Sequence, residues 1–359
     1  MSTIIYVLLA LLLLGIMITV HELGHFCAAR ACGIAVRAFG VGIGPKILSR
    51  KSKKSGTEYS LRLIPCGGFC AFYGEDDAQE THKEDPRSLL LQPAWKRLIC
   101  TAAGPLMNFV LALVVAFAFF MGYGLPYASG DIVTTVQSVN EGSPAEQAGF
   151  LAGDIILSVN GQAINGDFTD IVDAWQEGDA PLSVTVQRDD QEAQVQVTPY
   201  ESAQEGRKLI GITIVLSQQG EITWKHASVG KTLRHTWDVC VSAGGAILEA
   251  LERLFTSGEG VDEMSGPVGI ISQIAEQTRE YKLMGYLNML IMISINLGLV
   301  NLLPIPGLDG CRILFILIEI IFRRPVNRKV EAYIHLAGYM LLLALMLYFT
   351  FHDVVNIFG

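Results

Sequence analysis

Four long stretches of the chain are almost purely apolar and contain no Asp, Glu, Lys or Arg. They cover residues 1–21, 98–130, 283–308 and 332–352. A helix that crosses a bilayer needs roughly 20 apolar residues, so each stretch is long enough to do so. The pattern predicts an α-helical integral membrane protein with four transmembrane helices, which we place at residues 1–25, 98–125, 283–310 and 332–352.

The loop between the first two predicted spans, residues 26–97, contains β-structure. Residues 57–64 alternate polar and apolar side chains with the period of a strand, and the Pro-Cys-Gly-Gly of residues 65–68 indicates a turn. Residues 39–45 have glycine at alternate positions before a proline. No clear helix and no Lys-Ser/Thr pair follow them, so they predict a flexible loop at the membrane edge rather than a phosphate-binding loop.

Between the second and third spans, residues 128–218 consist of short alternating runs separated by Gly, Asp and Pro, which predicts a small β-rich domain. Residues 142–161 read GSPAEQAGFLAGDIILSVNG. This string resembles the G-S-P-A-x-x-A-G-L-x-x-G-D-x-I-x-x-(I/V)-N-G run of bacterial PDZ domains. It predicts a short helix started by proline, a strand and an Asn-Gly turn. PDZ domains bind extended peptides at a sheet edge, so a peptide or protein ligand is expected.

The segment 221–282 follows the β-rich domain. Within it, residues 224–255 carry apolar side chains at helical spacing and charged side chains on the opposite side. This pattern predicts an amphipathic helix. Two placements are open for it: packing on the PDZ domain, or lying along the outer membrane surface.

Basic residues are distributed unevenly along the chain. The loop 26–97 carries 12 Lys and Arg against 7 acidic residues, whereas residues 124–286 carry 9 against 23. The link 311–331 is again basic. The positive-inside rule therefore places the loop and the link in the cytosol, and the acidic segment and both termini outside it. No basic patch interleaved with aromatic residues indicates nucleic-acid binding.

Composition and cysteine usage agree with a membrane protein. Charged residues make up 17% of the chain, against about 25% in ordinary soluble proteins. The first span lacks the basic start of a signal peptide, so we expect it to be retained. Cys240 is the only cysteine in the acidic segment, which excludes a disulfide there. Cys66 and Cys70 form a C-x3-C without a second pair, so no zinc site is expected on them alone.

The first predicted span ends in His21-Glu22-Leu23-Gly24-His25. Histidines four residues apart lie on the same face of a helix and can share one zinc ion. Glu22 then lies where it can accept a proton from the attacking water. Since ionisable groups at a membrane boundary are functional by default, the motif predicts a metal-dependent hydrolytic site.

A catalytic zinc site needs a third protein ligand and one open position. The first and third predicted spans run in the same direction, so their ends lie at similar depth. The third ends at Asp309, after two prolines and two glycines break residues 301–310. Irregular backbone at membrane depth is tolerated where it lines a cavity, so Asp309 is the expected third ligand. The other histidines are expected to be surface or packing residues: His82, His226, His235, His335 and His352.

Three features together resemble the bacterial site-2 proteases, and among them the regulator-of-sigma-E protease group. They are H-E-L-G-H at the end of the first span, N-x-x-P-x-P-x-L-D-G at residues 301–310, and a PDZ insert between the second and third spans. Further matches are residues 63–69, which correspond to the family's membrane-edge β-hairpin, residues 103–109 and residues 266–270. The best-studied members carry two PDZ domains and this chain has room for one, so their mode of substrate gating is not carried over.

The resemblance implies an intramembrane zinc metalloprotease of the bacterial cell (inner) membrane that cleaves single-span membrane proteins, such as an anti-sigma factor or a remnant signal peptide. His21, His25 and Asp309 would hold Zn²⁺, Glu22 would be the general base, and Asn301 would contact the substrate backbone or its developing oxyanion. The strand around residues 61–64 would offer an edge for an extended substrate.

Two other interpretations stay open. One is a membrane-anchored zincin that cleaves soluble or loop peptides at the membrane surface, which keeps the zinc and changes the substrate. The other is a non-catalytic PDZ membrane receptor, which predicts loss of the ligands, whereas this chain has all three and Glu22.

Overall fold

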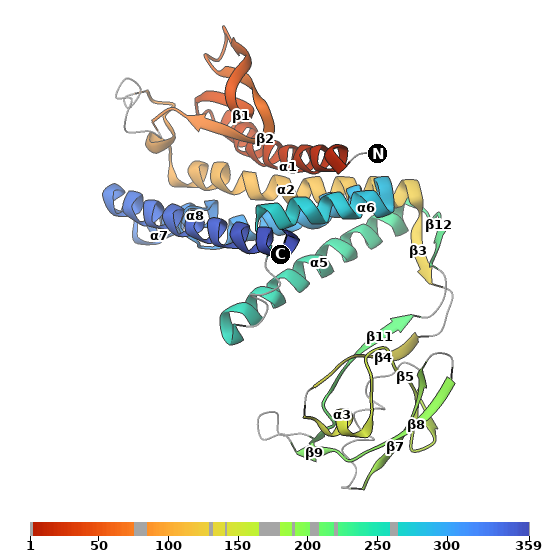
Figure 1. Ribbon diagram of the computed structural model, residues 1–359. Helices are drawn as coiled ribbons and strands as arrows, with labels where there is room; N and C mark the ends of the chain where they lie inside the picture. Colours follow the sequence, from red (N-terminus) through yellow and green to blue (C-terminus); the bar gives the residue numbers. More distant parts are fainter. Residues whose placement is uncertain are drawn as a thin grey trace. The chain divides into compact units, whose positions relative to one another are not determined.

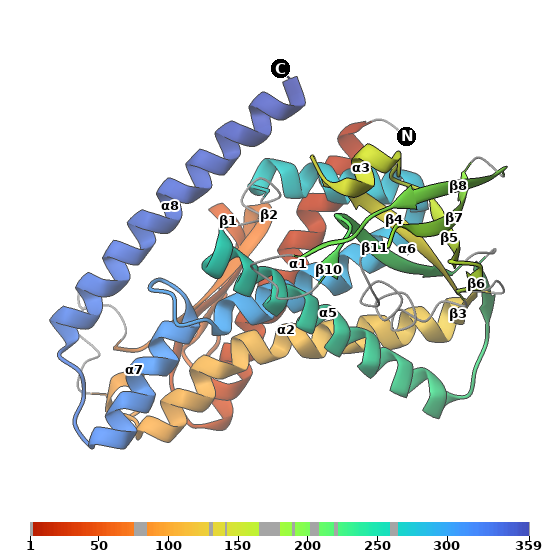
Figure 2. The same cartoon turned by 90° about the horizontal axis from the view of Figure 1, so that it is seen from below.

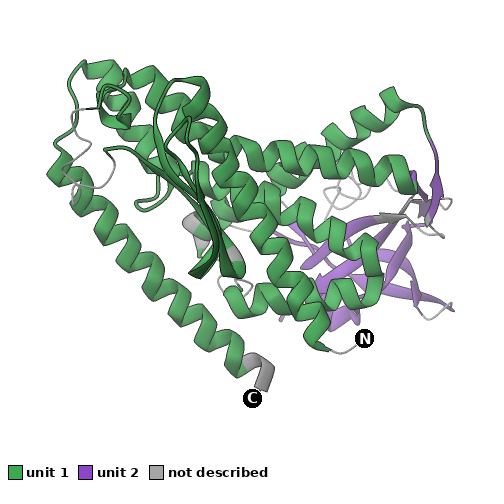
Figure 3. Ribbon diagram, turned by 90° about the horizontal axis from the view of Figure 1, so that it is seen from above, with its two compact units in different colours: residues 1–123, 227–359 green, residues 124–226 purple. Residues whose placement is uncertain are grey.

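The structure is a computed structural model of the 359-residue chain. We describe residues 3–74, 85–128, 132–140, 142–164, 180–188, 191–201, 208–218, 222–258 and 265–358. Predictions for His82 and for parts of the segment 128–218 lie outside the described residues. The chain divides into two compact units, one of residues 1–123 and 227–359 and one of residues 124–226 (Figure 3).

The first unit is built mainly from helices (Figure 1). Their bounds are α1 Thr3–Ala31, α2 Ala94–Tyr123, α5 Val229–Ser257, α6 Pro267–Leu302, α7 Asp309–Phe322 and α8 Arg328–Phe358, and a short 3₁₀ turn, η2 Leu89–Leu91, precedes α2. Within the described part of the chain, α1, α2, α6 and α8 are long and apolar enough to cross a membrane. Each of these four helices covers most of one charge-free stretch of the sequence.

The helix bounds differ most from the predicted spans at the two ends of the third span. The third span was predicted to run to residue 310, but α6 ends at Leu302 and a new helix, α7, starts at Asp309. The first 12 residues of the predicted link 311–331 therefore belong to α7. The apolar run of this helix is too short to cross a bilayer. α6 also begins earlier than predicted, at Pro267, and is kinked at Lys282, next to the predicted start of the span.

Helices α1, α2 and α6 pack against one another and form the centre of the first unit (Figure 1). One buried apolar cluster joins α1 and α6 through Ala10, Leu13, Met17, Ile274 and Leu290. α8 lies at the edge of this unit (Figure 2), and few residues of its apolar part are buried inside the unit. Its exposed side chains are mostly apolar, as expected for a helix surrounded by lipid.

The helix α5 is amphipathic, as predicted, and much of its apolar face is uncovered within the first unit. Val229, Leu233 and Trp237 are each 59% exposed. On another face of the helix, His235 meets Phe120 of α2 edge to face, with ring centroids 4.7 Å apart. α5 therefore packs on its own unit through one narrow face and presents a stripe of large apolar side chains.

Two long strands, β1 (Val36–Lys51) and β2 (Glu58–Phe72), form a sheet that contacts α1. Val41 pairs with Gly68 on one side and with Leu61 on the other, and Leu61 also pairs with Leu48. Each long strand therefore folds back on itself, β1 between residues 41 and 48 and β2 between residues 61 and 68. The second turn contains the predicted turn 65–68.

The predicted flexible loop at residues 39–45 is wrong, because these residues belong to β1. Gly42 and Gly44 have φ of +86° and +94°, and they allow the strand to bend there. The glycines at alternate positions thus belong to a bent strand, although such a composition is also typical of a loop.

The second unit contains a six-stranded sheet with the order β11-β4-β5-β7-β8, in which β6 pairs with β5. The strands are β4 Ile132–Val139, β5 Ile155–Val159, β6 Gln162–Ala163, β7 Leu182–Arg188, β8 Gln191–Val197 and β11 Ile212–Gln218. Two short pairs accompany the sheet, β3 (Leu125–Ala128) with β12 (Ile222–Lys225) and β9 (Tyr200–Glu201) with β10 (Lys208–Leu209). Alternate side chains of the strands form an apolar core that includes Val136, Val184 and Val186.

The helix and the turn predicted from residues 142–161 are present in this unit. α3 (Pro144–Ala148) follows Ser143, whose side chain accepts a hydrogen bond from the N–H of Glu146, and it ends at Gly149 with φ of +88°. Asn160 and Gly161 form the two-residue turn between β5 and β6, both with positive φ.

Candidate metal centre and active site

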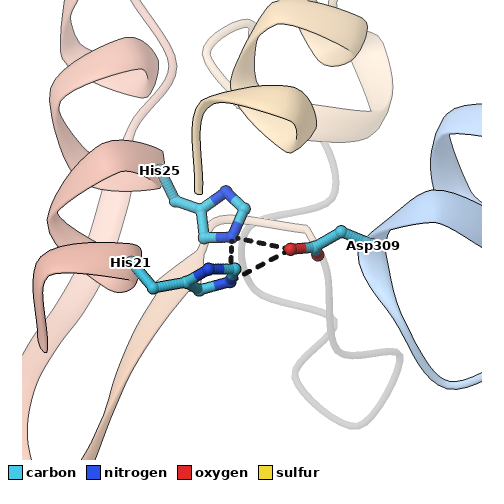
Figure 4. A group of neighbouring side chains, drawn as sticks. All are labelled: His21, His25 and Asp309. Carbon is cyan, nitrogen blue, oxygen red and sulfur yellow. Dashed lines mark hydrogen bonds and ion pairs between the residues drawn. The ribbon is translucent and has the colours of Figure 1, made fainter. Parts of the chain in front are cut away.

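The two predicted zinc-binding histidines lie one helical turn apart on α1. His21 and His25 are each 8% exposed, and their Nε2 atoms are 3.2 Å apart. The spacing of four residues places both rings on the same face of α1, and they point to one position (Figure 4).

Asp309 reaches the histidines from the break after α6. The segment 303–308 contains two prolines and Gly307, whose φ is +99°. α7 then begins at Asp309, and the Oδ2 atom of this residue lies 3.1 Å from Nε2 of His21 and 3.2 Å from Nε2 of His25 (Figure 4). The structure thus brings together the three residues that the sequence predicts as ligands.

The three ligand atoms fit a single zinc ion. In a tetrahedral site with bonds of about 2.0–2.1 Å, two ligand atoms lie roughly 3.3 Å apart. The observed separations are 3.1, 3.2 and 3.2 Å. Two imidazole nitrogens and one carboxylate oxygen also leave one coordination position open, which is the arrangement of catalytic zinc sites.

Helix α2 forms a wall directly behind the histidines. Nδ1 of His25 donates a hydrogen bond of 2.9 Å to the backbone carbonyl of Cys100. Gly104 lies so close that a Cβ atom there would overlap the ring of His25 and lie 2.9 Å from Nε2 of His21. Gly24 of α1 is equally tight, since its Cβ would overlap the carbonyl of Ala103. The site therefore requires two glycines at the α1–α2 contact.

Asn108, further along α2, lies against the other histidine. Its Nδ2 atom is 3.2 Å from Nδ1 of His21, and the residue is fully buried. Each of the two histidines thus has a polar group of α2 at its Nδ1 atom, the ring nitrogen that faces away from the predicted metal position.

Glu22 lies on the wall of the same cavity, next to the strand β2. The backbone N–H of Cys70 donates a hydrogen bond to its carboxylate. Gly68 of β2 lies close by, since a Cβ there would be 3.5 Å from Cγ of Glu22, an ordinary contact distance. The β1–β2 sheet therefore holds the predicted general base beside the metal position.

The cavity at the metal position has a volume of about 200 Å³. It is lined by His21, Glu22, His25, Phe69, Cys70, Phe72, Leu89, Thr101, Gly307, Leu308, Asp309, Arg312 and Tyr339. Asn301 lies in the last turn of α6, partly buried, and is not among these residues. Its contact with a substrate stays a prediction.

His335 on α8 supports the loop that carries Asp309. The backbone N–H of Gly307 donates a hydrogen bond of 3.1 Å to Nδ1 of His335. One turn further along α8, Gly338 is so close to the carbonyl of Pro306 that no Cβ would fit. His335 is buried and packs on Phe315, as expected for a packing residue, and it also holds the loop through this hydrogen bond.

Sequence reasoning missed the residues around the ligands, namely Asn108, Gly104 and His335. Gly104 and Asn108 belong to residues 103–109, which resemble the corresponding segment of the site-2 proteases. The resemblance does not indicate what these two residues do. His335 lies near the start of an otherwise apolar span. An isolated histidine at such a place carries no specific signal of its role.

Comparisons with known proteins agree with this chemistry. Residues 9–345 match the profile of peptidase family M50. The regulator of sigma-W protease RasP of Bacillus subtilis is 30% identical to this chain, with 97% of this chain and 98% of that protein covered. The zinc metalloprotease RasP of Bacillus licheniformis is 29% identical over 97% of this chain and 98% of that protein.

Among solved structures, the PDZ domain of an SdrC-like protein from Listeria monocytogenes matches part of the chain. It is 24% identical and covers 25% of this chain and 93% of that domain, with a TM-score of 0.22. The family assignment depends instead on the profile, which extends over nearly the whole chain, and on relatives that are covered over nearly their whole length. This chain belongs to peptidase family M50, the family of the site-2 proteases, and is a zinc metalloprotease.

Proposed function

We propose that this metalloprotease cleaves peptide bonds within or next to the transmembrane segment of single-span membrane proteins. The observation that carries the proposal is the location of the His-His-Asp cluster. Its two histidines are buried on α1, a helix apolar enough to cross a membrane, and they lie against a second such helix, α2. A substrate that reaches this cluster has to come through the membrane or along its surface.

His21, His25 and Asp309 are the residues that would hold Zn²⁺. When bound, zinc polarises the scissile carbonyl and lowers the pKa of a water molecule towards about 7. Glu22 accepts the proton of the attacking water and delivers it to the amine of the leaving peptide. The hydrogen bond from Cys70 keeps the carboxylate of Glu22 on the cavity wall for both transfers.

The substrate would bind as an extended strand at the cavity. An α-helix uses its own backbone carbonyls in hydrogen bonds, so a transmembrane substrate must unwind before cleavage. We place the docking edge at residues 68–72 rather than at the predicted residues 61–64. Leu61 is paired on both sides, whereas residues 68–72 form an outer segment of the sheet and Phe69, Cys70 and Phe72 line the cavity.

The basic loop 26–97 supports an orientation with the metal centre near the cytosolic face and with both termini and the second unit outside the cytosol. We infer from residues 142–161 that the second unit is a PDZ domain that binds a peptide or protein there. RasP of Bacillus subtilis is named as a regulator of sigma-W, so a membrane-bound sigma-factor regulator is one candidate substrate, and a remnant signal peptide is another.

Two further assignments complete the proposal. The exposed stripe of α5 supports its placement along the outer membrane surface, with the lipid bilayer as its partner. Asn301, at the end of α6, would contact the backbone of a bound substrate or its developing oxyanion.

The test uses the purified full-length protein in proteoliposomes, with a single-span probe protein and a soluble peptide of the same cleavage sequence. Glu22→Gln keeps the size of the side chain but cannot take a proton at neutral pH. We expect it to lower cleavage of the single-span probe by about 10²–10⁴-fold at unchanged zinc content. Glu58→Gln, which changes a carboxylate that does not line the cavity, is the matched control and should cleave like the parent.

Three outcomes would contradict the proposal. Cleavage by Glu22→Gln within a few-fold of the parent would remove the general-base role. A soluble peptide cut as fast as the single-span probe would favour a protease of the membrane surface. A parent protein that binds a peptide through the second unit but cleaves nothing would favour a receptor.

A further inference from the structure

Helix α2 holds the two histidines of the cluster through different groups. Nδ1 of His25 lies 2.9 Å from the carbonyl oxygen of Cys100. A carbonyl only accepts hydrogen bonds, so Nδ1 carries the proton, and Nε2 of the neutral ring is free to bind a metal. Nδ1 of His21 instead lies 3.2 Å from the side-chain amide of Asn108, which can either donate or accept.

Only one of these two possibilities suits a metal ligand. Nε2 of His21 lies 3.1 Å from Oδ2 of Asp309, so this nitrogen faces the metal position. A neutral imidazole that binds metal through Nε2 has its proton on Nδ1 and needs an acceptor there. In Asn108 the amide oxygen can accept, whereas the amide nitrogen cannot.

As placed, the amide has its two polar atoms the other way round. Asn108 is fully buried, and within the described part of the chain its Oδ1 has no hydrogen-bond partner while Nδ2 faces His21. Half a turn of the amide exchanges the two atoms at almost the same shape, and it places Oδ1 opposite the Nδ1–H of His21.

We propose that Asn108 is a positioning residue of the metal centre. Its Oδ1 accepts the hydrogen bond from Nδ1–H of His21 and thereby fixes the tautomer and the ring orientation that present Nε2 to the metal. The inference rests on the zinc site of the proposed function. α2 thus supplies an acceptor to each histidine, the backbone carbonyl of Cys100 to one and the side chain of Asn108 to the other.

The test compares acceptor-free and acceptor-only replacements at this position in the full-length protein in detergent. Asn108→Leu has a similar size without a polar atom, and Asn108→Ala removes the acceptor without any clash. Both should bind zinc about 10–100-fold more weakly than the parent. Asn108→Asp, which can accept but not donate, should keep the parent affinity or exceed it. Ser294→Ala, a change at another fully buried polar residue, is the control and should bind zinc like the parent.

Zinc affinity is measured by competition with a coloured chelator, and the visible spectrum of the Co²⁺-loaded protein reports the ligand geometry. The spectrum should change in Asn108→Leu and Asn108→Ala and stay like the parent's in Asn108→Asp. A second, purely structural role of Asn108 would lower thermal stability in all three variants without separating Asp from Leu.

Two results would overturn the inference. One is zinc affinity within twofold of the parent in both acceptor-free variants. The other is an Asn108→Asp variant that binds zinc as weakly as Asn108→Leu, which would mean that Asn108 acts as a donor. Neither measurement involves proteolysis, so a protein that binds zinc as expected but cleaves no membrane substrate would contradict the proposed function and leave this inference standing.

Discussion

Two carboxylates, one in each unit, have different electrostatic surroundings. Asp154 of the second unit is 1% exposed, and both its oxygens accept hydrogen bonds of 2.7 Å from the guanidinium of Arg188. The N–H of Leu151 donates another, at 2.9 Å. Asp309 of the first unit instead lies against the imidazoles of His21 and His25 at the metal position.

The difference separates a structural carboxylate from a functional one. The charge of Asp154 is neutralised by a fixed cation of the same unit, so the group needs nothing from outside. The charge of Asp309 lies between two side chains that are neutral when they bind metal, and a divalent cation would balance it. The partners of each carboxylate distinguish the two groups.

Removing the charge of Asp309 should have the largest effect. We expect Asp309→Asn to bind zinc more than about 100-fold more weakly than the parent, because a ligand is lost as well as a charge. Asp154→Asn is the matched control and should bind zinc within twofold of the parent. Chelator competition on both variants measures this, and full zinc content and activity in Asp309→Asn would disprove the ligand assignment.

A change at His335 tests how the ligand loop is supported. His335→Asn places an oxygen near the position of Nδ1, which accepts from the N–H of Gly307, whereas His335→Gln places its polar atoms near Nε2. We expect His335→Gln to weaken zinc binding by about 10-fold and His335→Asn to stay close to the parent. Equal losses in the two variants would show that the ring matters through packing rather than through this hydrogen bond.

Removing the charge of Asp154 should weaken the second unit alone. Asp154→Asn loses charge-assisted hydrogen bonds, and we expect the free energy of unfolding of this unit to fall by about 1–3 kcal/mol. Hydrogen exchange of the β4, β5 and β7 amides in the full-length protein measures the change. Unchanged exchange there, or faster exchange in α1 and α2 as well, would contradict the separation of the two carboxylates.

The smallest expected effect is a dependence on acid. Burial raises the pKa of Asp154, but the hydrogen bonds from Arg188 and Leu151 lower it further, so the pKa lies below its usual value. The contribution of Asp154 to stability is therefore complete above about pH 4 and is lost as the pH falls through the depressed pKa. Protection of the β5 and β7 amides should fall in this acid range in the parent, and this component should be absent from Asp154→Asn.

Much of the first unit could be predicted because its signals are local in the sequence. Charge-free stretches of sufficient length indicate the apolar helices, and the spacing of His21 and His25 places two ligands on one helix face. Asp309 could be added because helix direction and the Pro-Gly break place it near them. In the second unit, residues 142–161 predict the proline-started helix and the Asn160–Gly161 turn, because turn chemistry is also local.

The remaining features depend on contacts between segments far apart in the sequence. The acceptor role of Asn108 requires knowing that its face of α2 meets His21, 87 positions away. The double bend of β1 and β2 depends on pairing that strand-period alternation does not show. The helix α7 is not predicted because it is too short to cross a bilayer, although the predicted third ligand is its first residue.

The two glycines at the contact between α1 and α2 have a consequence for the variation that the protein tolerates. Neither Gly24 nor Gly104 takes part in any chemistry, yet a single methyl group on either would overlap backbone or a ligand ring. In a saturation mutagenesis scan scored by activity, both positions should be as intolerant as His21, whereas exposed apolar positions of α8 should accept most apolar residues. In such a scan, the glycine positions that tolerate no larger residue would show where α1 and α2 meet at the metal centre.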